Sequence, residues 1–413
     1  MSSAPNPPSI GDLHDEQIVA LLRSGAHANL LSAYFGDVLY RELSQLARLA
    51  AIRRNERGER VLILPGVMGS RLGEGTAGAP LIWLHPAAVA EGLLSQLALP
   101  GSKPLRALGI MLPGYLKLKL SLEAAGFRPE FHAFDWRKDL LSLGDELLHT
   151  IQGGNEPVAI VAHSMGGLVA RAALRNDRSR RISRLIQLGA PNRGSFAPVQ
   201  ALRAVYPTVR KIAALDWRHS AEELARDVFR TIAGLYQLLP EGDGGFLDPS
   251  RWPKDELTPD AQLLAEARNA RAQLPAADDR CFLIAGTNQE TVVAAELRGT
   301  QLEYTIRPDG DGTVPLALAA WRGARTWYVQ ENHGALTNNN SVLAAIDDIL
   351  RTGETRRLDE HPPAIDRGFS RQITDEELRR EATAKVRWDT LSLDSRRRIL
   401  EPVISPEFRT SSA

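Results

Sequence analysis

Residues 158–171 constrain the fold of this chain more than any other segment. They read VAIVAHSMGGLVAR, in which a run of small and β-branched apolar residues is followed, after a serine, by a helical pattern. A strand that turns into a helix at such a serine is typical of the nucleophile elbow, which exposes the hydroxyl at the carboxyl end of a sheet. The pattern departs from the usual one only in having Ala162 in place of the first glycine. We therefore predict that Ser164 is a nucleophile; a tight turn without chemistry is the alternative.

The rest of the chain alternates short apolar runs with helical patterns, which is typical of a parallel sheet covered on both faces. The predicted strands are residues 61–64, 131–134, 158–162, 185–188, 281–285 and 326–329. Two segments, roughly 81–115 and 196–275, are too long for ordinary connections and are expected to form a cap or lid. Together these features predict an α/β-hydrolase fold with a mostly parallel central sheet, flanking helices and a helical cap.

Both ends of the chain extend beyond this pattern. Apolar residues spaced for helices predict two helices between residues 12 and 54, and the charged tail after about residue 352 is predicted to be helical and outside the sheet. The expected division is an N-terminal helical extension (1–58), an α/β-hydrolase catalytic domain (59–352) and a C-terminal charged extension (353–413). The length and charge of the extensions favour docking of a protein partner.

Composition narrows the classes of partner. Lys and Arg together number 50, as do Asp and Glu, so the chain has no excess of positive charge for nucleic acid. We find neither an apolar run of 18 residues nor the pattern of a signal peptide, which makes the cytoplasm the expected location. Export by a system that needs no cleaved signal is the alternative. Peripheral contact with a membrane stays compatible with this sequence, because apolar insertion does not depend on net charge. The single cysteine, Cys281, rules out a disulfide within the chain.

A serine nucleophile needs a base, and the base needs a carboxylate to orient it. In the α/β-hydrolase fold these partners follow the serine in the order acid, then histidine. Three histidines follow Ser164, and two of them are unsuitable: His219 lies in the predicted cap and His361 in the polar tail. His333 follows the last predicted strand, where a loop would carry it over the sheet edge, and is the predicted base.

Two carboxylates compete for the orienting role, Asp309 and Asp311, in the run RPDGDGTVP at residues 307–315. The GDGTVP part resembles the acid-bearing loop of many lipases and favours Asp311, with Asp309 as the alternative. Two carboxylates are too few for a calcium site of six to eight oxygens. We expect neither a metal nor an organic cofactor.

The negatively charged oxygen of a tetrahedral intermediate needs backbone N–H donors that are already in place. Met165, directly after the nucleophile, is the first predicted donor. The second is expected from the loop after residues 61–64, where Gly66 and Gly69 permit a tight turn. Met68 is the predicted residue, and Val67 is the alternative.

Five motifs, in this order, resemble the lecithin:cholesterol acyltransferase family of lipases and phospholipid acyltransferases. They are LPGVMGSRL (64–72), FDWR (134–137), HSMGG (163–167), LGAPNRGS (188–195) and GDGTVP (310–315). The resemblance covers roughly residues 60–345. The paired cysteines of the secreted animal members are absent, and the first and last sixty residues have no recognised counterpart.

The resemblance implies a triad of Ser164, Asp311 and His333, with Met68 and Met165 as oxyanion donors. It further implies esters with long acyl chains as substrates and a mobile lid near residues 81–115. Val67, Trp83 and Trp136 are the predicted substrate contacts; the alternative is that these apolar segments are plain core. The expected activity is hydrolysis of lipid acyl esters. Acyl transfer to an alcohol or lysolipid, or a catalytically silent binding module, are the alternatives.

Overall fold

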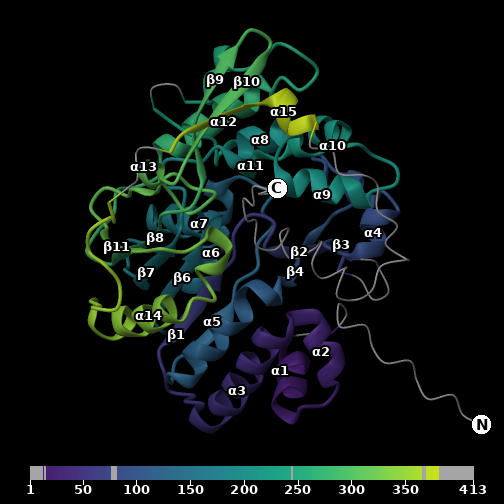
Figure 1. Ribbon diagram of the computed structural model, residues 1–413. Helices are drawn as coiled ribbons and strands as arrows, with labels where there is room; N and C mark the ends of the chain where they lie inside the picture. Colours follow the sequence, from purple (N-terminus) through teal and green to yellow (C-terminus); the bar gives the residue numbers. More distant parts are fainter. Residues whose placement is uncertain (1–12, 14, 76–80, 243–244, 365–368, 381–413) are drawn as a thin grey trace, which may run out of the picture.

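The computed structural model describes residues 13, 15–75, 81–242, 245–364 and 369–380. Its centre is a parallel sheet in the strand order β11-β8-β7-β6-β1-β5 (Figure 1). The strands are β1 (Arg60–Leu64), β5 (Arg128–Phe131), β6 (Val158–His163), β7 (Ile182–Leu188), β8 (Cys281–Gly286) and β11 (Arg325–Val329). The predicted mostly parallel sheet is thus confirmed, with β6, the strand before Ser164, near its middle.

One predicted strand is misplaced. The apolar run at residues 131–134 overlaps β5 only at Phe131, and the sequence of the strand is the largely polar RPEF. β5 stops at Phe131 because that residue pairs with Ile63, the last residue of β1 that pairs with β5. Pro129 is tolerated there because β5 is an edge strand, where a missing N–H costs no ladder bond.

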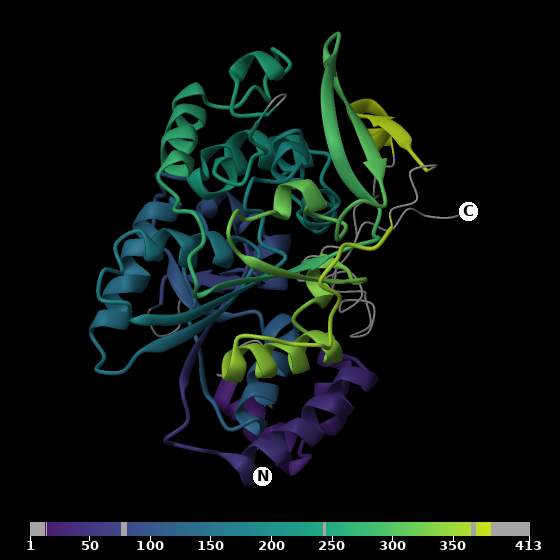
Figure 2. The ribbon, with the colours of Figure 1, turned by 90° about the vertical axis from the view of Figure 1, so that its left-hand side faces the viewer.

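Helices cover both faces of the sheet (Figure 2). Alternate side chains of β1 and β6 point to opposite faces and enter two separate hydrophobic clusters. One cluster contains residues of α6 (Leu140–Gln152) and α7 (Met165–Leu174); the other contains residues of α5 (Leu112–Ala124) and α14 (Asn340–Thr352). This burial on both faces explains why the strands read as continuous apolar runs.

The segment predicted as a cap is helical. It holds α8 (Ala197–Leu202), α9 (Pro207–Leu215), α10 (Ala221–Asp227), α11 (Ala233–Tyr236) and α12 (Ala261–Ala272), which lie above the central sheet in Figure 1. The other predicted insertion contains strands as well as the helix α4 (Pro86–Ala90). Its strands β3 (Leu81–Trp83) and β4 (Arg106–Ile110) pair on either side of β2 (Ser70–Gly73) in a small antiparallel sheet.

The C-terminal tail is predicted to be helical, but its described part contains a strand as well as a helix. Strand β12 (Arg371–Thr374) pairs with β10 (Gln301–Arg307), which itself forms a hairpin with β9 (Thr291–Arg298). The following helix, α15 (Asp375–Arg380), begins with a fully buried carboxylate that accepts hydrogen bonds from Arg203 and Tyr304. These contacts tie the tail to the cap. The arginine run at residues 396–398 lies outside the described residues.

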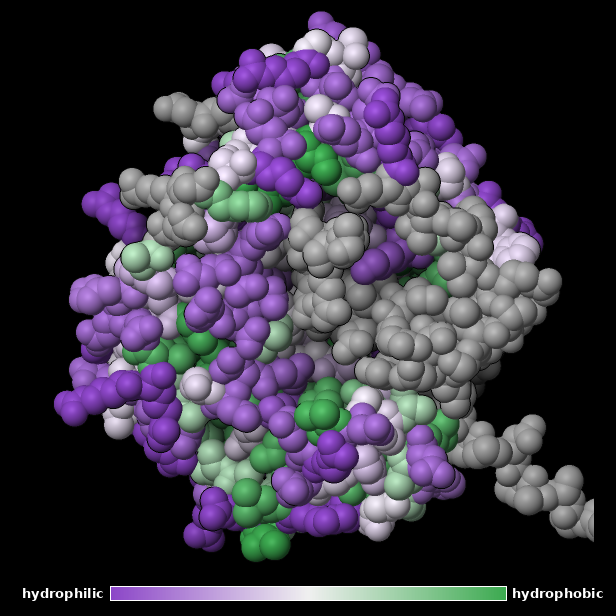
Figure 3. All heavy atoms as spheres, in the orientation of Figure 1, coloured by the Kyte–Doolittle hydropathy of each residue, from purple (hydrophilic) through white to green (hydrophobic). Residues whose placement is uncertain are grey.

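Three helices, rather than the predicted two, precede the sheet: α1 (Asp15–Ser24), α2 (Ala28–Phe35) and α3 (Asp37–Arg53). Gly36, with φ 82°, separates α2 from α3 in a conformation that a continuous helix cannot contain. The three helices bury their apolar sides against α5. On the face seen in Figure 3 the described surface is mainly hydrophilic, with small hydrophobic areas over these helices. Among the described helices none is both long and apolar enough to cross a bilayer, and a cytoplasmic location stays a prediction.

Candidate active site

Ser164 occupies the turn between β6 and α7 with φ 53° and ψ −124°. Positive φ is unfavourable for a residue with a side chain and persists only where the surroundings enforce it. Here the packing is too tight for larger neighbours. A Cβ on Gly166 would lie 2.4 Å from the Pro65 carbonyl oxygen, and one on Gly167 would lie 2.6 Å from the Ala190 Cβ. The segment therefore has the geometry of a nucleophile elbow, as its sequence predicts.

The structure brings Ser164, His333 and Asp311 into one line of hydrogen bonds. His333 Nε2 lies 2.9 Å from Ser164 Oγ, and His333 Nδ1 lies 2.7 Å from Asp311 Oδ2. All three side chains are buried. Since a carboxylate only accepts, Nδ1 carries the proton and Nε2 of the neutral ring is free to accept from the serine hydroxyl.

The geometry distinguishes Asp311 from Asp309. The second carboxylate oxygen of Asp311 accepts from the backbone N–H groups of Thr313 (3.0 Å) and Val314 (2.7 Å). Its carbonyl oxygen accepts from the His333 N–H at 2.8 Å. Asp309 instead faces Arg307 at 3.9 Å. Of the two aspartates, Asp311 is therefore the one whose carboxylate is hydrogen-bonded to His333.

Two glycines that sequence reasoning missed make room for this pair. A Cβ on Gly189, which has φ +56°, would lie 2.9 Å from Asp311 Oδ2 and 3.0 Å from His333 Nδ1. A Cβ on Gly286 would lie 2.6 Å from the Asp311 Cβ. Both glycines stand at the carboxyl ends of sheet strands, β7 and β8, so the sheet edge itself leaves space for the acid.

The loop after β1 lies directly against the serine. A Cβ on Gly66 would be 2.9 Å from the Ser164 Cβ. The Gly69 N–H donates to the Gly66 carbonyl at 3.0 Å and closes a tight turn, in which Met68 has φ 62°. The Gly66 N–H is already bonded to the Tyr115 hydroxyl. Among the described residues the N–H groups of Val67 and Met68 have no hydrogen-bond acceptor, so both stay available as donors.

Met165, the other predicted donor, directly follows Ser164 in the structure. It is the first residue of α7, and the N–H groups of the first helical turn have no acceptor within the helix. The partial positive charge of this helix end also favours a developing negative charge beside Ser164.

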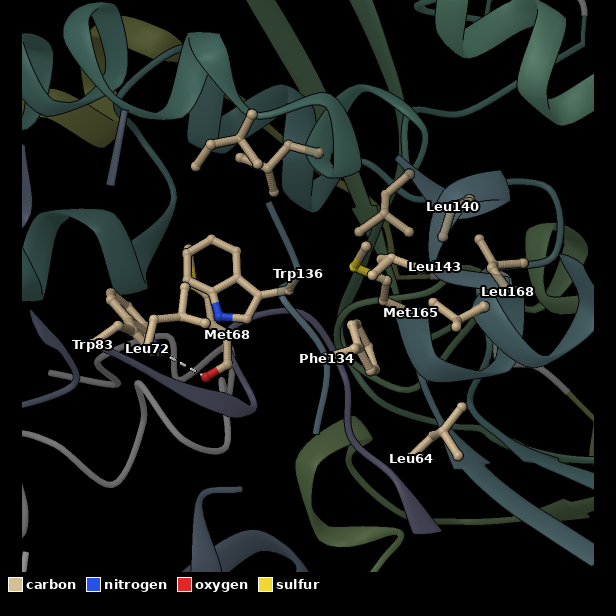
Figure 4. Close-up of a cluster of buried hydrophobic side chains, with 14 of the residues drawn as sticks. Leu64, Met68, Leu72, Trp83, Phe134, Trp136, Leu140, Leu143, Met165 and Leu168 are labelled. Atoms are coloured by element: carbon tan, nitrogen blue, oxygen red, sulfur yellow. Dashed lines mark hydrogen bonds between the residues drawn. The ribbon is translucent and has the colours of Figure 1, made fainter. Parts of the chain in front are cut away.

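The predicted substrate contacts Trp83 and Trp136 are buried and pack edge to face, with ring centroids 5.3 Å apart (Figure 4). The Trp83 indole donates to the Met68 carbonyl at 2.8 Å, and the Trp136 indole to the Ser70 carbonyl at 3.2 Å. The two rings thus brace the loop beneath the serine. Val67 is half-buried against the same cluster. Contact of these three residues with substrate stays a prediction.

The neighbouring motif residues Asp135 and Arg137 have a bracing role. Arg137 donates twice to the Asp135 carboxylate, at 2.9 and 2.7 Å, and also bonds the carbonyls of Leu97 and Leu105 at 3.3 Å. Of the other histidines after Ser164, His219 pairs with Asp216 in the cap.

His163 is expected to make the stability of the protein depend on pH. Burial, together with the neighbouring His333, lowers the pKa of His163 to about 3. In the unfolded chain His163 therefore binds a proton near pH 6.5, whereas in the folded chain it stays neutral at that pH. The free energy of unfolding consequently falls as the pH drops below 6.5. The slope reaches about 1.4 kcal/mol per pH unit. We expect urea unfolding between pH 7 and 5 to show this loss, and His163→Gln to reduce the slope.

Two comparisons define this experiment. Burial also lowers the pKa of His132, so part of the slope should survive in His163→Gln. Replacement of the exposed His149 by Gln should leave the slope as it is in the wild type. An equal slope in His163→Gln and wild type would contradict the prediction.

Comparison with known proteins supports the resemblance in sequence. Residues 113–277 match the model of the lecithin:cholesterol acyltransferase family. This range includes Ser164, Tyr115 and Trp136; Asp311 and His333 lie beyond it. No curated protein sequence matches the chain.

A solved structure with a TM-score above 0.5 supports the fold. A chain of the Tle4–Tli4 complex has 14% identity and a TM-score of 0.51, with 72% of this chain and 100% of that chain covered. The Bacillus licheniformis lipase BlEst2 in its propeptide form has 14% identity and a TM-score of 0.41, over 76% of this chain and 54% of the lipase. The Legionella pneumophila phospholipase PlaB has 15% identity and a TM-score of 0.26, over 63% and 45%. The chain has the α/β-hydrolase fold, and its resemblance to the lecithin:cholesterol acyltransferase family is confirmed over residues 113–277.

Proposed function

We propose that this chain is a serine hydrolase that cleaves acyl esters of lipids through an acyl-enzyme on Ser164. The observation that carries the proposal is the buried line from Asp311 through His333 to Ser164, with separations of 2.7 and 2.9 Å. Nucleophile, base and orienting acid stand in hydrogen-bond order beside backbone N–H groups that have no acceptor in the described ranges, which is the arrangement that acyl transfer requires.

In this mechanism His333 takes the Ser164 proton as Oγ attacks the ester carbonyl. The negative charge that develops on the carbonyl oxygen is stabilised by the N–H of Met165 and by that of Met68 or Val67. Asp311 stabilises the imidazolium, which then protonates the leaving alcohol. Water, activated by His333, releases the acid and restores the serine.

The lipid character of the substrate rests on the family match over residues 113–277 and on the apolar surroundings of the loop at residues 65–69. The same family name supports a second candidate function. An alcohol or lysolipid would replace water as acceptor of the acyl group. Both functions share the acyl-enzyme and differ only in the last step.

The terminal extensions are proposed to dock a protein partner. The N-terminal helices pack on α5, and β12 with α15 packs on the hairpin β9–β10 beside the cap. Each extension therefore contacts an element next to the site, where a bound partner could alter activity.

The test combines chemistry and product. A fluorophosphonate probe should add one adduct to the pure protein, on the tryptic peptide containing Ser164. Phosphatidylcholine vesicles should yield free fatty acid at a rate that falls in proportion to this labelling. An added long-chain alcohol distinguishes the two functions, because acyl transfer would divert the fatty acid into a new ester. A protein that neither reacts with the probe nor releases fatty acid would be a silent binding module.

A further inference from the structure

A buried chain of hydrogen bonds joins the two loops that flank Ser164. The Gly66 N–H donates to the Tyr115 hydroxyl at 2.8 Å. That hydroxyl lies 2.9 Å from His163 Nδ1, and His163 Nε2 lies 3.0 Å from the His333 carbonyl oxygen. This series of hydrogen bonds thus begins at the predicted oxyanion loop and ends at the backbone of the predicted base.

The chemistry of the four groups fixes the direction of every proton. The His333 carbonyl only accepts, so His163 carries its proton on Nε2. Nδ1 of the neutral ring must then accept, and the Tyr115 hydroxyl is its donor. The same hydroxyl oxygen accepts from the Gly66 N–H. Burial favours the neutral state of both side chains, since it raises the pKa of Tyr115 and lowers that of His163.

The first turn of α5, which carries Tyr115, is attached to both loops by further hydrogen bonds outside this series. The Met111 N–H donates to the Gly69 carbonyl at 2.9 Å. From the other side, Thr337 donates to the Gly114 carbonyl at 2.6 Å and Asn338 to the Pro113 carbonyl at 3.2 Å. Thr337 and Asn338 belong to the loop that carries His333. Residues 111–115 therefore connect the donor loop to the base loop.

The space around these groups permits little displacement. A Cβ on Gly69 would lie 3.1 Å from the Tyr115 hydroxyl. On the other side, the rings of His163 and His333 are in contact, with centroids 4.7 Å apart. A shift of Tyr115 or His163 would thus be transmitted to the turn at residues 66–69 and to the backbone of His333.

We propose that Tyr115 and His163 are positioning residues that hold the donor loop and His333 in register on either side of Ser164. Neither side chain is hydrogen-bonded to Ser164 Oγ or His333 Nε2; both act through the backbone groups of Gly66 and His333 to which they are bonded. The inference rests on the proposed function, because that function requires donors and base to be aligned at the same moment. Misplacement of a reacting group by about 1 Å costs on the order of 100-fold in rate.

The chain offers a matched control in the cap. The Tyr236 hydroxyl is bonded in the same manner as that of Tyr115, since it donates to the Arg230 carbonyl at 2.9 Å and accepts from the Asp260 N–H at 2.9 Å. Both tyrosines are buried. Tyr115→Phe and Tyr236→Phe therefore remove equivalent bonds, and only the first removal affects the loops around Ser164.

We expect Tyr115→Phe to lower kcat on a p-nitrophenyl ester by roughly 10- to 100-fold, with KM changed by less than about 3-fold. The rate of fluorophosphonate labelling should fall in parallel. Tyr236→Phe should lose a similar amount of thermal stability and keep both rates within about 2-fold of wild type. Thermal melts of both variants separate a loss of positioning from a loss of fold.

Variants at His163 test the hydrogen bonds that link Tyr115 to the His333 backbone. His163→Ala removes both bonds, whereas His163→Gln retains an amide with one donor and one acceptor group. We expect the glutamine variant to recover several-fold in kcat over the alanine variant. If Tyr115→Phe matches Tyr236→Phe in kcat and labelling, the positioning role is overturned while the proposed function stands. If the wild type shows no Ser164-dependent turnover, the proposed function fails, and the inference fails with it.

Discussion

Replacement of Ser164 by alanine is expected to reduce ester hydrolysis by a factor on the order of 10⁶. The substitution removes the oxygen that would carry the acyl group, and within the described part of the chain Ser164 Oγ is the hydroxyl bonded to His333 Nε2, at 2.9 Å. The backbone donors and the bound substrate remain, so residual activity above that of water is expected. The rate is measured on a p-nitrophenyl ester and as fatty acid released from phosphatidylcholine vesicles.

The fold should survive this change. The Ser164 side chain forms no capping bond to α7, and alanine retains the Cβ that packs against Gly66. Ser195→Ala, at another buried serine, is the matched control and should keep its activity. Loss of both hydrolysis and acyl transfer in Ser164→Ala is expected, because both use one acyl-enzyme. Activity within 10-fold of wild type would refute the assignment of Ser164.

The sequence predicted those parts of the fold whose signal is local. The segment around Ser164 carries its strand, its turn and its helix within fourteen residues, and the structure reproduces them. β5 was missed because its polar residues fit an edge strand, where burial places fewer demands on the sequence.

The sheet of β9, β10 and β12 contains one local sequence signal that was missed and one pairing that the sequence does not reveal. Leu302, Tyr304 and Ile306 alternate with polar residues and are buried in the structure, and the loop before them contains Gly299 with φ +62°. Such an alternation, preceded by a two-residue loop that contains glycine, is a sequence signature of a β-hairpin. β12 has only four residues, and its pairing with β10 depends on a contact between distant parts of the chain.

Some residues of the candidate site could likewise be predicted from the sequence, and others could not. Chain order and elimination point to Ser164 and His333, and the structure places them together. The indoles of Trp83 and Trp136 could not be assigned from sequence, because an apolar residue beside a site reads the same whether it faces substrate or core. The hydrogen bond between the Gly66 N–H and the Tyr115 hydroxyl joins residues 49 positions apart, and no sequence motif indicates it.

The choice between Asp311 and Asp309 was also open in sequence, and it yields the second large prediction. Asp311→Asn is expected to lower kcat by roughly 10³- to 10⁴-fold. The backbone N–H groups of Thr313 and Val314 both donate to Oδ1, so the amide oxygen of an asparagine must take that place. Its NH₂ group then faces His333 Nδ1, which has to accept. The proton moves to Nε2, and the ring can no longer accept the hydroxyl proton of Ser164.

Asp309→Asn provides the comparison, since its carboxylate faces Arg307 rather than His333. That variant should keep kcat within about 2-fold of wild type, because loss of a partly exposed ion pair has little effect on the fold. Both variants are nearly isosteric, so melting curves and kcat on a p-nitrophenyl ester can be compared directly. A larger loss of kcat in Asp309→Asn than in Asp311→Asn would reverse the assignment of the acid. Equal and small losses would mean that the base is oriented without either carboxylate, which the 2.7 Å contact to His333 Nδ1 argues against.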